Sequence, residues 1–168
     1  MGTNTSALSL NQLAKPSVLW LTFFGAGLLR PAPGTWGSVV ALAVWWWGLS
    51  EWPVLTQGLV VVVYTLVSWW VCAKFLHRTG LHDEPQIVAD EVAGLWLALL
   101  FVPVTWWAGL LAFALFRLFD IAKPSLIGWL DRNTKGGLGV MADDLAAGLA
   151  AGLICLLYTS DAADELSS

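Results

Sequence analysis

The sequence predicts an all-α fold, a compact bundle of membrane helices whose short polar loops gather on one face. Hydrophobic residues make up 58% of the chain and charged residues 12%, whereas soluble proteins average about 45–50% and about 25%. The run Val54–Phe75 carries a single charge near its end and reaches the roughly 20 residues that cross a bilayer. Most of the 12 tryptophans flank such runs, where amphipathic rings suit the membrane interface. A buried helix of a soluble bundle is the alternative interpretation of this run.

Three segments precede the first long helix. Residues 1–17 form a polar arm, and residues 18–29 form an apolar stretch that Arg30 and two prolines follow. A cleavable signal peptide would end in small residues, so this stretch is not interpreted as one. The segment RPAPGTWGS at 30–38 is rich in turn-forming residues and is predicted to be a loop.

Two hydrophobic helices and a polar loop are predicted to follow. The helices cover about Val39–Leu49 and Val54–Leu76, and the chain turns between them near Glu51 and Pro53. Charged and turn-forming residues at 77–90 then predict a polar loop.

The apolar run Val92–Phe116 has two alternative paths, because Pro103 interrupts it. A straight helix would place the loop at 77–90 and the polar region Arg117–Asp144 on opposite sides of the bilayer. A hairpin that turns at Pro103 would place all eight lysines and arginines on one side and leave only Glu51 in the opposite loops. Lysines and arginines near span ends favour the cytoplasmic side. We therefore favour the hairpin, although its arms are short for full spans.

The last helix is predicted to begin at Leu145, and it is short for a membrane span. The residues from Leu145 to Tyr158 would rise only about 21 Å, against a hydrocarbon core of about 30 Å. The ending LLYTSDAADE resembles the translated read-through of a sequencing adapter. We therefore expect the natural sequence to stop near Ile154 or Cys155 and treat residues 155–168 as a doubtful tail.

Four pairs of acidic residues lie in or beside these apolar segments, where a carboxylate is costly and needs a reason. Two of the pairs are predicted to open helices, so capping explains them as well as a functional site does. Asp120 follows an apolar run toward a helix C-terminus, where the helix dipole disfavours an anion, so capping cannot explain it. The pairs are Asp83 with Glu84, Asp90 with Glu91 (helix start), Asp120 with Asp131, and Asp143 with Asp144 (helix start).

Two basic residues share a predicted helix face with Asp120, because Arg117 and Lys123 lie three residues on either side of it. One interpretation is a salt-bridged surface. The other is that the bases hold a phosphate while the acids hold a metal ion, as phosphoryl transfer requires. Mg²⁺ suits oxygen ligands. Histidine is too scarce for a His-rich metal site, since His77 and His82 stand alone and are expected to be solvated.

Two glycine-containing segments could bring backbone N–H groups to a phosphate. The loop at 30–38 places Arg30 and Thr35 just before a helix, whose N-terminus attracts anions, although a structural turn explains this loop equally well. Gly136 and Gly137 lie just ahead of Asp143 and would let the backbone approach a phosphate closely.

Two further patterns are given structural explanations. Gly148 and Gly152 have the GxxxG spacing that suits close helix packing. Cys72 and Cys155 lie in apolar runs without a CxxC or Cys/His pattern, so neither a zinc site nor a disulfide framework is indicated.

Three long blocks rich in glycine and aspartate stand out: FGAGLLRPAPGTWGSVVAL at 24–42, IVADEVAGLW at 87–96 and FRLFDIAKPSLIGWLDRNTKGGLGVMADDLAAGLAAG at 116–152. In this order they closely resemble the phosphatidylglycerophosphatase A family, and the resemblance spans about residues 24–154. It implies one helical domain at 18–154 and a multi-pass enzyme of the bacterial inner membrane whose site faces the cytoplasm. Such an enzyme hydrolyses phosphatidylglycerophosphate to phosphatidylglycerol and inorganic phosphate with Mg²⁺.

The resemblance also implies which residues act. By their positions in the matching blocks we expect Asp90, Glu91, Asp120, Lys123, Asp131, Asp143, Asp144 and, less directly, Thr35. We hypothesise direct attack by water, with Mg²⁺ held by Asp90, Glu91, Asp143 and Asp144. In this mechanism Asp120, Asp143, Asp144 and Lys123 are catalytic, with Asp120 the general base or a further ligand. The predicted substrate-binding residues are Arg30, Thr35, Lys123, Arg132, Gly136 and Gly137.

Rival functions lack their sequence signatures. A CDP-alcohol phosphotransferase needs a D-G-x₂-A-R motif, and an aspartyl-phosphate enzyme needs a DxDxT motif, neither of which occurs here. A transporter would place charges along a path through the bilayer, whereas here they are expected at one edge. We expect a lipid substrate and a membrane as partners, and no nucleic acid. The number of metal ions, the lipid selectivity and the pairing of chains into an oligomer stay open.

Overall fold

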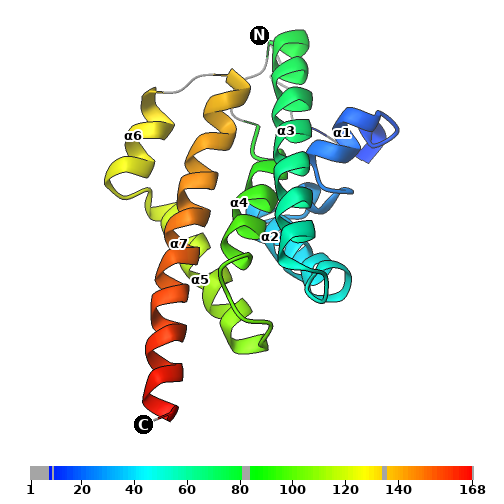
Figure 1. The fold of residues 1–168 in the computed structure, drawn as a ribbon. Coiled ribbons are helices and arrows are strands. Elements are labelled where there is room, and N and C mark those ends of the chain that lie inside the picture. Colours follow the sequence, from blue (N-terminus) through cyan, green and yellow to red (C-terminus); the bar gives the residue numbers. More distant parts are fainter. Residues whose placement is uncertain (1–7, 9, 81–83, 134–135, 168) are drawn as a thin grey trace.

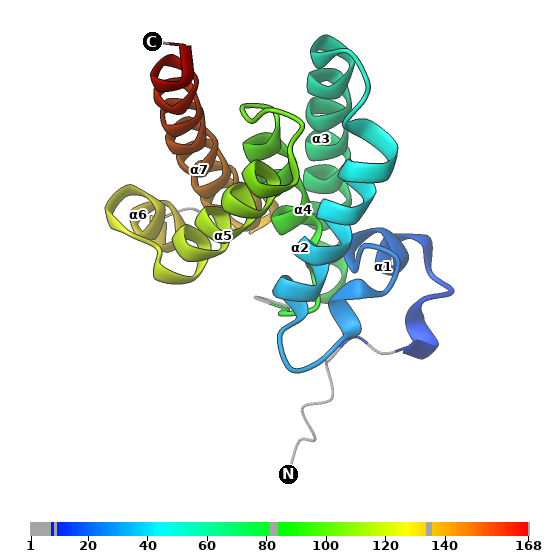
Figure 2. The same ribbon diagram turned by 90° about the horizontal axis from the view of Figure 1, so that it is seen from below.

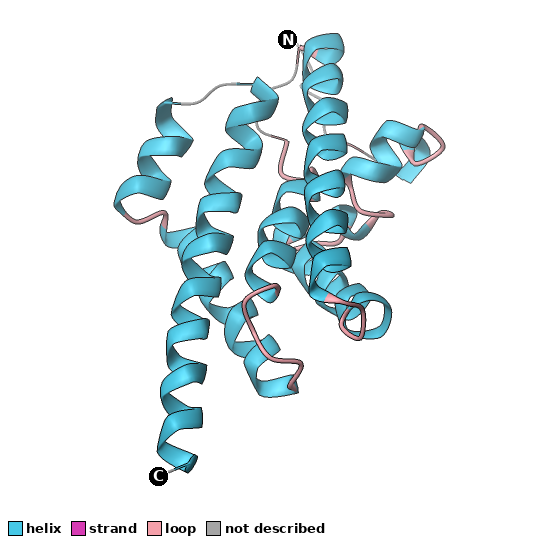
Figure 3. Ribbon diagram, in the orientation of Figure 1, coloured by secondary structure: helices cyan, strands magenta, loops and turns pink. Residues whose placement is uncertain are grey.

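The protein is a bundle of helices, as a computed structural model shows for residues 8, 10–80, 84–133 and 136–167 (Figures 1 and 3). This described part contains no strand, which confirms the prediction of an all-α fold. The elements are η1 (Leu10–Gln12), α1 (Pro16–Leu21), η2 (Ala26–Leu28), α2 (Pro33–Val44), the π-helical turn η3 (Trp45–Leu49), α3 (Val54–Thr79), α4 (Ala89–Leu99), α5 (Trp106–Ala122), α6 (Ser125–Asn133) and α7 (Gly136–Ser167).

Helix α4 is the centre of the bundle. It contacts α2 and α3 on one side and α5 and α7 on the other (Figure 2). Its side chains are buried on nearly every face, with Val92, Ala93 and Leu95 completely inaccessible. A short helix that is apolar all round is stable only when its neighbours cover it, so α4 is the scaffold against which the other helices are placed.

Helices α4 and α7 cross with their backbones in contact. A Cβ atom added at Gly148 would overlap the carbonyl oxygen of Gly94, and one added at Gly94 would overlap the carbonyl oxygen of Asp144. One turn further, a Cβ at Gly152 would lie 2.7 Å from the ring of Phe101. The interpretation of Gly148 and Gly152 as a packing motif is therefore confirmed, and Gly94 is the partner that the motif needs.

The first turn of α4 is held by the segment before it. The N–H of Val88 donates to the carbonyl of Leu21 over 2.8 Å. The Val88 side chain is fully buried between Gly27 and Gly37, where added Cβ atoms would lie 3.0 Å and 2.7 Å from it. Because both neighbours are glycines, the Val88 side chain packs closely between them. This packing determines where α4, which follows Val88, begins.

The run Val92–Phe116 forms a hairpin, as the sequence analysis favoured. α4 ends at Leu99, the chain turns at 100–105 through Pro103, and α5 begins at Trp106 and packs back against α4. A straight helix through this run is thereby excluded. The C-terminal ends of α3 and α5 and the N-terminal ends of α4 and α7 consequently lie toward the same end of the bundle (Figure 1).

Two helices are long and apolar enough to cross a membrane, α3 at Val54–Thr79 and α7 over Gly136–Ser160. Only 28% of the most apolar window of α3 is buried inside the protein, and valines, leucines and tryptophans cover its outer face. A water-exposed surface of this size is unfavourable, which supports the prediction that the bundle lies in a membrane.

Two predicted helix starts were wrong. α2 begins at Pro33 instead of Val39, because proline is well suited to the first helical position and the glycines behind it do not interrupt the helix. α7 begins at Gly136 instead of Leu145. The 25 residues up to Ser160 rise about 37 Å, so the expected shortfall of the last helix does not exist. The doubtful tail at 155–168 stays a prediction.

Candidate active site

Three carboxylates from two helices meet where α4 and α7 cross. One oxygen each of Asp90, Glu91 and Asp144 lies within 4.8 Å of the others. Asp90 and Glu91 are in the first turn of α4, as the sequence analysis predicted. Because Gly94 follows Asp90 by four residues and Gly148 follows Asp144 by four, the carboxylates lie one helical turn from the backbone contact. We call this group the acidic triad.

Helix capping does not explain Asp143 and Asp144, contrary to the alternative that the sequence left open. They are the eighth and ninth residues of α7, whose first residue is Gly136, and their side chains are 7% and 4% exposed. Backbone N–H groups in the interior of a helix already have acceptors, so these carboxylates have no capping role. Capping remains relevant only for Asp90, whose Oδ1 accepts the N–H of Glu91 over 3.0 Å.

The acidic triad is crowded with negative charge. The pKa of Asp90 is raised to about 6, mainly by burial and to a smaller extent by the charge of Asp143, against three hydrogen bonds that lower it. Burial also raises the pKa of Glu91 well above its usual range, with added repulsion from Asp90, Asp144 and Asp120. Glu91 Oε2 is buried and accepts no hydrogen bond. Such a group is stabilised either by protons or by a cation, so the donor set fits an oxygen-ligated divalent ion.

Basic side chains border the acidic triad on the side of α5. The Lys123 ammonium lies 2.8 Å from Asp143 Oδ2. Arg117 forms an ion pair with Asp120, and Asp120 is close enough to Asp144 to interact with it. The placement of Asp120 in the last turn of a helix is confirmed, since α5 ends at Ala122.

The start of α2 forms another side of the site. A Cβ added at Gly34 would overlap Glu91 Oε1 and would lie 3.2 Å from Arg117 Nη1. Arg117 Nη2 lies 3.4 Å from the hydroxyl of Thr35. The structure therefore brings Thr35 to the site as predicted, but on a helix instead of a loop.

The remaining predicted residues are placed less centrally. Arg30 and Arg132 are exposed, and Gly137 packs against the backbone of Ala73 on α3, so helix packing already requires a glycine there. Gly136 has a left-handed φ of 70° where α7 begins. Their roles in substrate binding stay predictions. Predictions on His82, Asp83 and the side chain of Asp131 lie outside the described residues.

Asp143 is not a member of the acidic triad, although it was predicted to bind the metal with the other three. Successive residues of a helix point about 100° apart, so Asp144 faces α4 while Asp143 faces Lys123. Its role as a metal ligand stays a prediction, and it forms an ion pair with Lys123.

Two residues that build the site were not among the predicted site residues. Gly94 sets the helix crossing, and the only sequence signal was a glycine within a helix otherwise made of larger apolar residues. Arg117 had a stronger signal, its spacing of three residues from Asp120, for which the sequence analysis offered a surface salt bridge and phosphate binding as alternatives.

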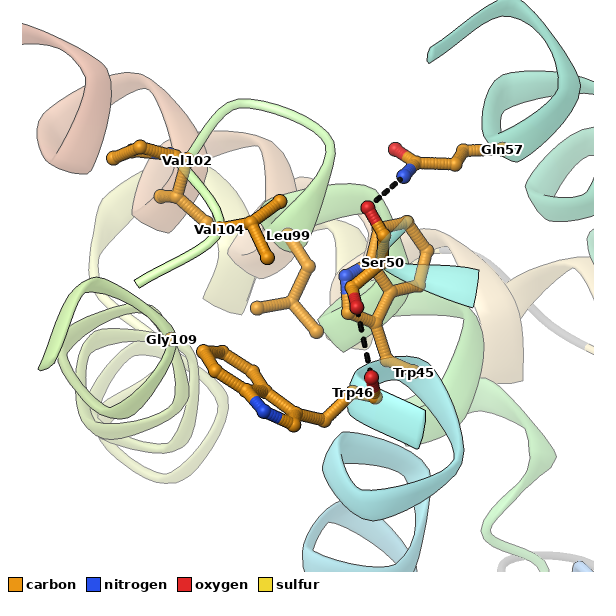
Figure 4. A pocket seen from close by; sticks show the side chains of 9 residues that line it. Trp45, Trp46, Ser50, Gln57, Leu99, Val102, Val104 and Gly109 are labelled. Carbon is orange, nitrogen blue, oxygen red and sulfur yellow. Dashed lines mark hydrogen bonds between the residues drawn. The ribbon is translucent and has the colours of Figure 1, made fainter. Parts of the chain in front are cut away.

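A small pocket lies at the other end of the bundle, away from the acidic triad. Gln57 donates its amide to the carbonyls of Leu49, Ser50 and Trp52 over 3.0 Å each and thereby closes the turn between η3 and α3 (Figure 4). The pocket is lined by Trp45, Trp46, Ser50, Gln57, Leu99, Val102, Pro103, Val104 and Gly109. It contains no ionisable group and is not the candidate active site.

Comparison with known proteins gives consistent matches. The profile of the family Phosphatidylglycerophosphatase A matches residues 19–159. The Phosphatidylglycerophosphatase A of Escherichia coli is 36% identical over 88% of this chain and 87% of its own length, and that of Haemophilus influenzae is 36% identical over 90% and 94%. A Bacteroides thetaiotaomicron protein, provisionally named a phosphatidylinositol-3-phosphatase, is 40% identical over 79% and 86%. No solved structure matches the chain.

Proposed function

Because this chain belongs to the phosphatidylglycerophosphatase A family, we propose that it hydrolyses phosphatidylglycerophosphate to phosphatidylglycerol and inorganic phosphate in phospholipid biosynthesis. The observation that carries this proposal is the meeting of Asp90, Glu91 and Asp144 from two helices, beside Lys123 and Arg117. A cluster of carboxylates beside positively charged side chains is suited to the hydrolysis of a phosphate monoester, which requires stabilisation of charge on the phosphoryl oxygens.

Mg²⁺ is the proposed cofactor, and the acidic triad is its proposed site. All three ligands are oxygens, and the buried, unpartnered Glu91 Oε2 supports a bound cation there. When bound, Mg²⁺ supplies charge neutralisation for the phosphoryl oxygens. Asp143 holds the Lys123 ammonium beside the acidic triad, which places a second positive charge next to the reacting phosphate.

Asp120 is the proposed general base. It lies next to Asp144, and its ion pair with Arg117 fixes its orientation. A water oxygen attacks phosphorus and gives a proton to Asp120 while the bond between phosphorus and the glycerol oxygen breaks. The leaving oxygen takes a proton from solvent and Asp120 releases its proton to solvent, so one water is consumed and the products are a lipid alcohol and inorganic phosphate.

The proposed location is the inner membrane, with the site on the cytoplasmic side. Two helices are apolar enough to span. Lys74 and Arg78 lie in the last turns of α3. The C-terminal end of α3 is at the same end of the bundle as the N-terminal ends of α4 and α7 (Figure 1). Basic residues at one end of the spans favour the cytoplasmic side.

The test is the release of inorganic phosphate by purified protein in dodecyl maltoside micelles. Phosphatidylglycerophosphate, phosphatidic acid and phosphatidylinositol 3-phosphate are each incubated with Mg²⁺ or with EDTA. We expect release from phosphatidylglycerophosphate, and only with Mg²⁺. Preferred release from the inositol lipid would instead assign the substrate that the name of the Bacteroides relative suggests. No release from any of the three would refute the proposal.

A further inference from the structure

The side of the site that faces α2 contains a partly buried guanidinium, that of Arg117, whose Nε is buried and has no acceptor. We propose that Arg117 and Thr35, with the first turn of α2, bind the non-bridging oxygens of the substrate's phosphoryl group opposite the acidic triad. This inference rests on the proposed function and assigns the phosphate-contacting residues within it. Of the residues that the sequence analysis named for substrate binding, Thr35 lies on this side of the site, whereas Lys123 is paired with Asp143.

Arg117 has hydrogen-bonding capacity that the protein does not fill. A guanidinium carries five N–H donors in a planar fork. In this chain Nη1 pairs with Asp120, Nη2 has only a long 3.4 Å contact with the Thr35 hydroxyl, and Nε is buried with no acceptor. Leaving buried donors of a charged group unpaired is costly, so this arrangement is expected where a ligand supplies the missing acceptors.

The first turn of α2 adds donors at the same place. Pro33 has no N–H, and the N–H groups of Gly34 and Thr35 precede the first intrahelical bond, which Trp36 makes to Ala32 over 3.1 Å. Ala32 has no side chain that could accept them. A Cβ at Gly34 would overlap Glu91 Oε1, so glycine is what allows this turn to approach the acidic triad.

The two sides of the site have complementary chemistry. The acidic triad would hold the cation, while the side formed by α2 and Arg117 presents a guanidinium, a hydroxyl and a helix N-terminus, all of which attract anions. In phosphoryl transfer, negative charge is spread over the three equatorial oxygens of the transition state. A planar fork can contact two of these oxygens at once, which a lysine ammonium cannot do. Asp120 orients the fork through its ion pair with Nη1.

The experiment measures phosphate binding and metal binding separately. Arg117→Ala, Arg117→Lys and Thr35→Val are compared with Arg78→Ala, an exposed arginine in the last turn of α3. Inorganic phosphate affinity is measured by equilibrium dialysis with Mg²⁺ present, and metal affinity by the electron paramagnetic resonance of added Mn²⁺.

We expect Arg117→Ala and Arg117→Lys to weaken phosphate binding by about 10- to 100-fold and Thr35→Val by about 3- to 10-fold, as loss of charged and neutral hydrogen bonds predicts. Mn²⁺ affinity should stay within about 3-fold. Added guanidinium ion should restore part of the phosphatase activity of Arg117→Ala. Arg78→Ala should leave every measurement unchanged.

Two results would overturn the inference. The first is phosphate affinity within 2-fold of the unaltered protein in soluble Arg117→Lys and Thr35→Val, the variants that conserve charge or shape. The second is a loss of Mn²⁺ affinity equal to the loss of phosphate affinity. That result would mean that Arg117 positions the acidic triad and does not bind phosphate directly. Unaltered protein that binds phosphate but does not cleave phosphatidylglycerophosphate would refute the proposed function and leave this inference standing.

Discussion

The carbonyl oxygen of Gly94 lies where a Cβ atom of Gly148 would stand, and the carbonyl oxygen of Asp144 lies where a Cβ atom of Gly94 would stand, so neither glycine can carry a side chain. This contact joins α4 to α7 one helical turn from Asp90 and Asp144. The acids of the acidic triad come from segments more than 50 residues apart, and no backbone hydrogen bond links the two helices directly. The distance between these carboxylates is therefore a consequence of how closely the two helices pack.

Replacing Gly148 by alanine should push α4 and α7 apart and thereby inactivate the site. The new Cβ would meet the backbone of α4, which cannot move aside as a flexible side chain can. We expect a loss of stability of about 1–3 kcal/mol and loss of Mg²⁺-dependent phosphate release, measured by thermal unfolding in detergent and by activity. Gly58→Ala on α3 is the matched control, because a Cβ there meets nothing within 4 Å. Equal effects of the two substitutions would contradict this account.

Asp144→Asn should separate metal binding from folding. The substitution conserves shape but removes one charge from a crowded acidic cluster. Without metal we expect the variant to unfold at the same temperature as the unaltered protein or a higher one, since like charges repel. The rise in unfolding temperature that Mg²⁺ causes should disappear, and activity should fall by at least about 100-fold. A retained response to Mg²⁺ would remove Asp144 from the metal site.

Asp143→Asn should have a different effect from Asp144→Asn. In the structure Asp143 pairs with Lys123 and lies outside the acidic triad. We expect the Mg²⁺-dependent rise in unfolding temperature to survive in Asp143→Asn, while activity falls because Lys123 loses the partner that positions it. If this variant also lost its response to Mg²⁺, the predicted role of Asp143 as a metal ligand would be correct.

The metal-free protein should become less stable as the pH rises through the titration range of Asp90. Its pKa is about 6 in the folded protein against 3.8 for the free side chain, so the folded state binds more protons between these values. The contribution of Asp90 is most favourable below pH 4 and is lost by about pH 6. The difference in unfolding temperature between the unaltered protein and Asp90→Asn, measured in EDTA from pH 4 to 8, should follow this curve. A difference that does not depend on pH would contradict the raised pKa.

The hairpin of α4 and α5 makes a prediction about topology. Cysteines introduced at Glu84 and Asn133, in a variant that lacks Cys72 and Cys155, should react with a membrane-impermeant maleimide from the same side of sealed vesicles. Glu84 lies between α3 and α4, and Asn133 is the last residue of α6 before α7. The C-terminal end of α3 and the N-terminal ends of α4 and α7 lie toward the same end of the bundle (Figure 1). Reaction of the two cysteines from opposite sides would contradict the hairpin, because an odd number of helices between them would then have to cross the membrane.

Helix class was predictable, because it depends on local features of the chain, and the structure brings three of the predicted site residues together, Asp90, Glu91 and Asp144. Apolar runs such as Val54–Phe75 indicate spanning helices through composition and length alone. Helix starts were harder. The segment ahead of Leu145 is rich in glycine and charge, which suggests a loop, yet it is helical from Gly136 because Gly137 and Gly148 pack against α3 and α4. Tertiary contacts there outweigh the low helix propensity of glycine.

The sequence by itself determined that this protein is helical, that its composition is more apolar than that of soluble proteins and that it carries the blocks of a lipid phosphatase family. It also predicted that aspartates and glutamates carry the chemistry. Only the tertiary structure decided which of these acids share a site. Asp143 and Asp144 are neighbours in sequence, but one faces Lys123 and the other the first turn of α4. The physical reason is that a helix fixes the direction of each side chain relative to its own axis, whereas the partner it meets depends on where two axes cross. Here that crossing is set by Gly94 and Gly148, where the absence of side chains lets two backbones touch.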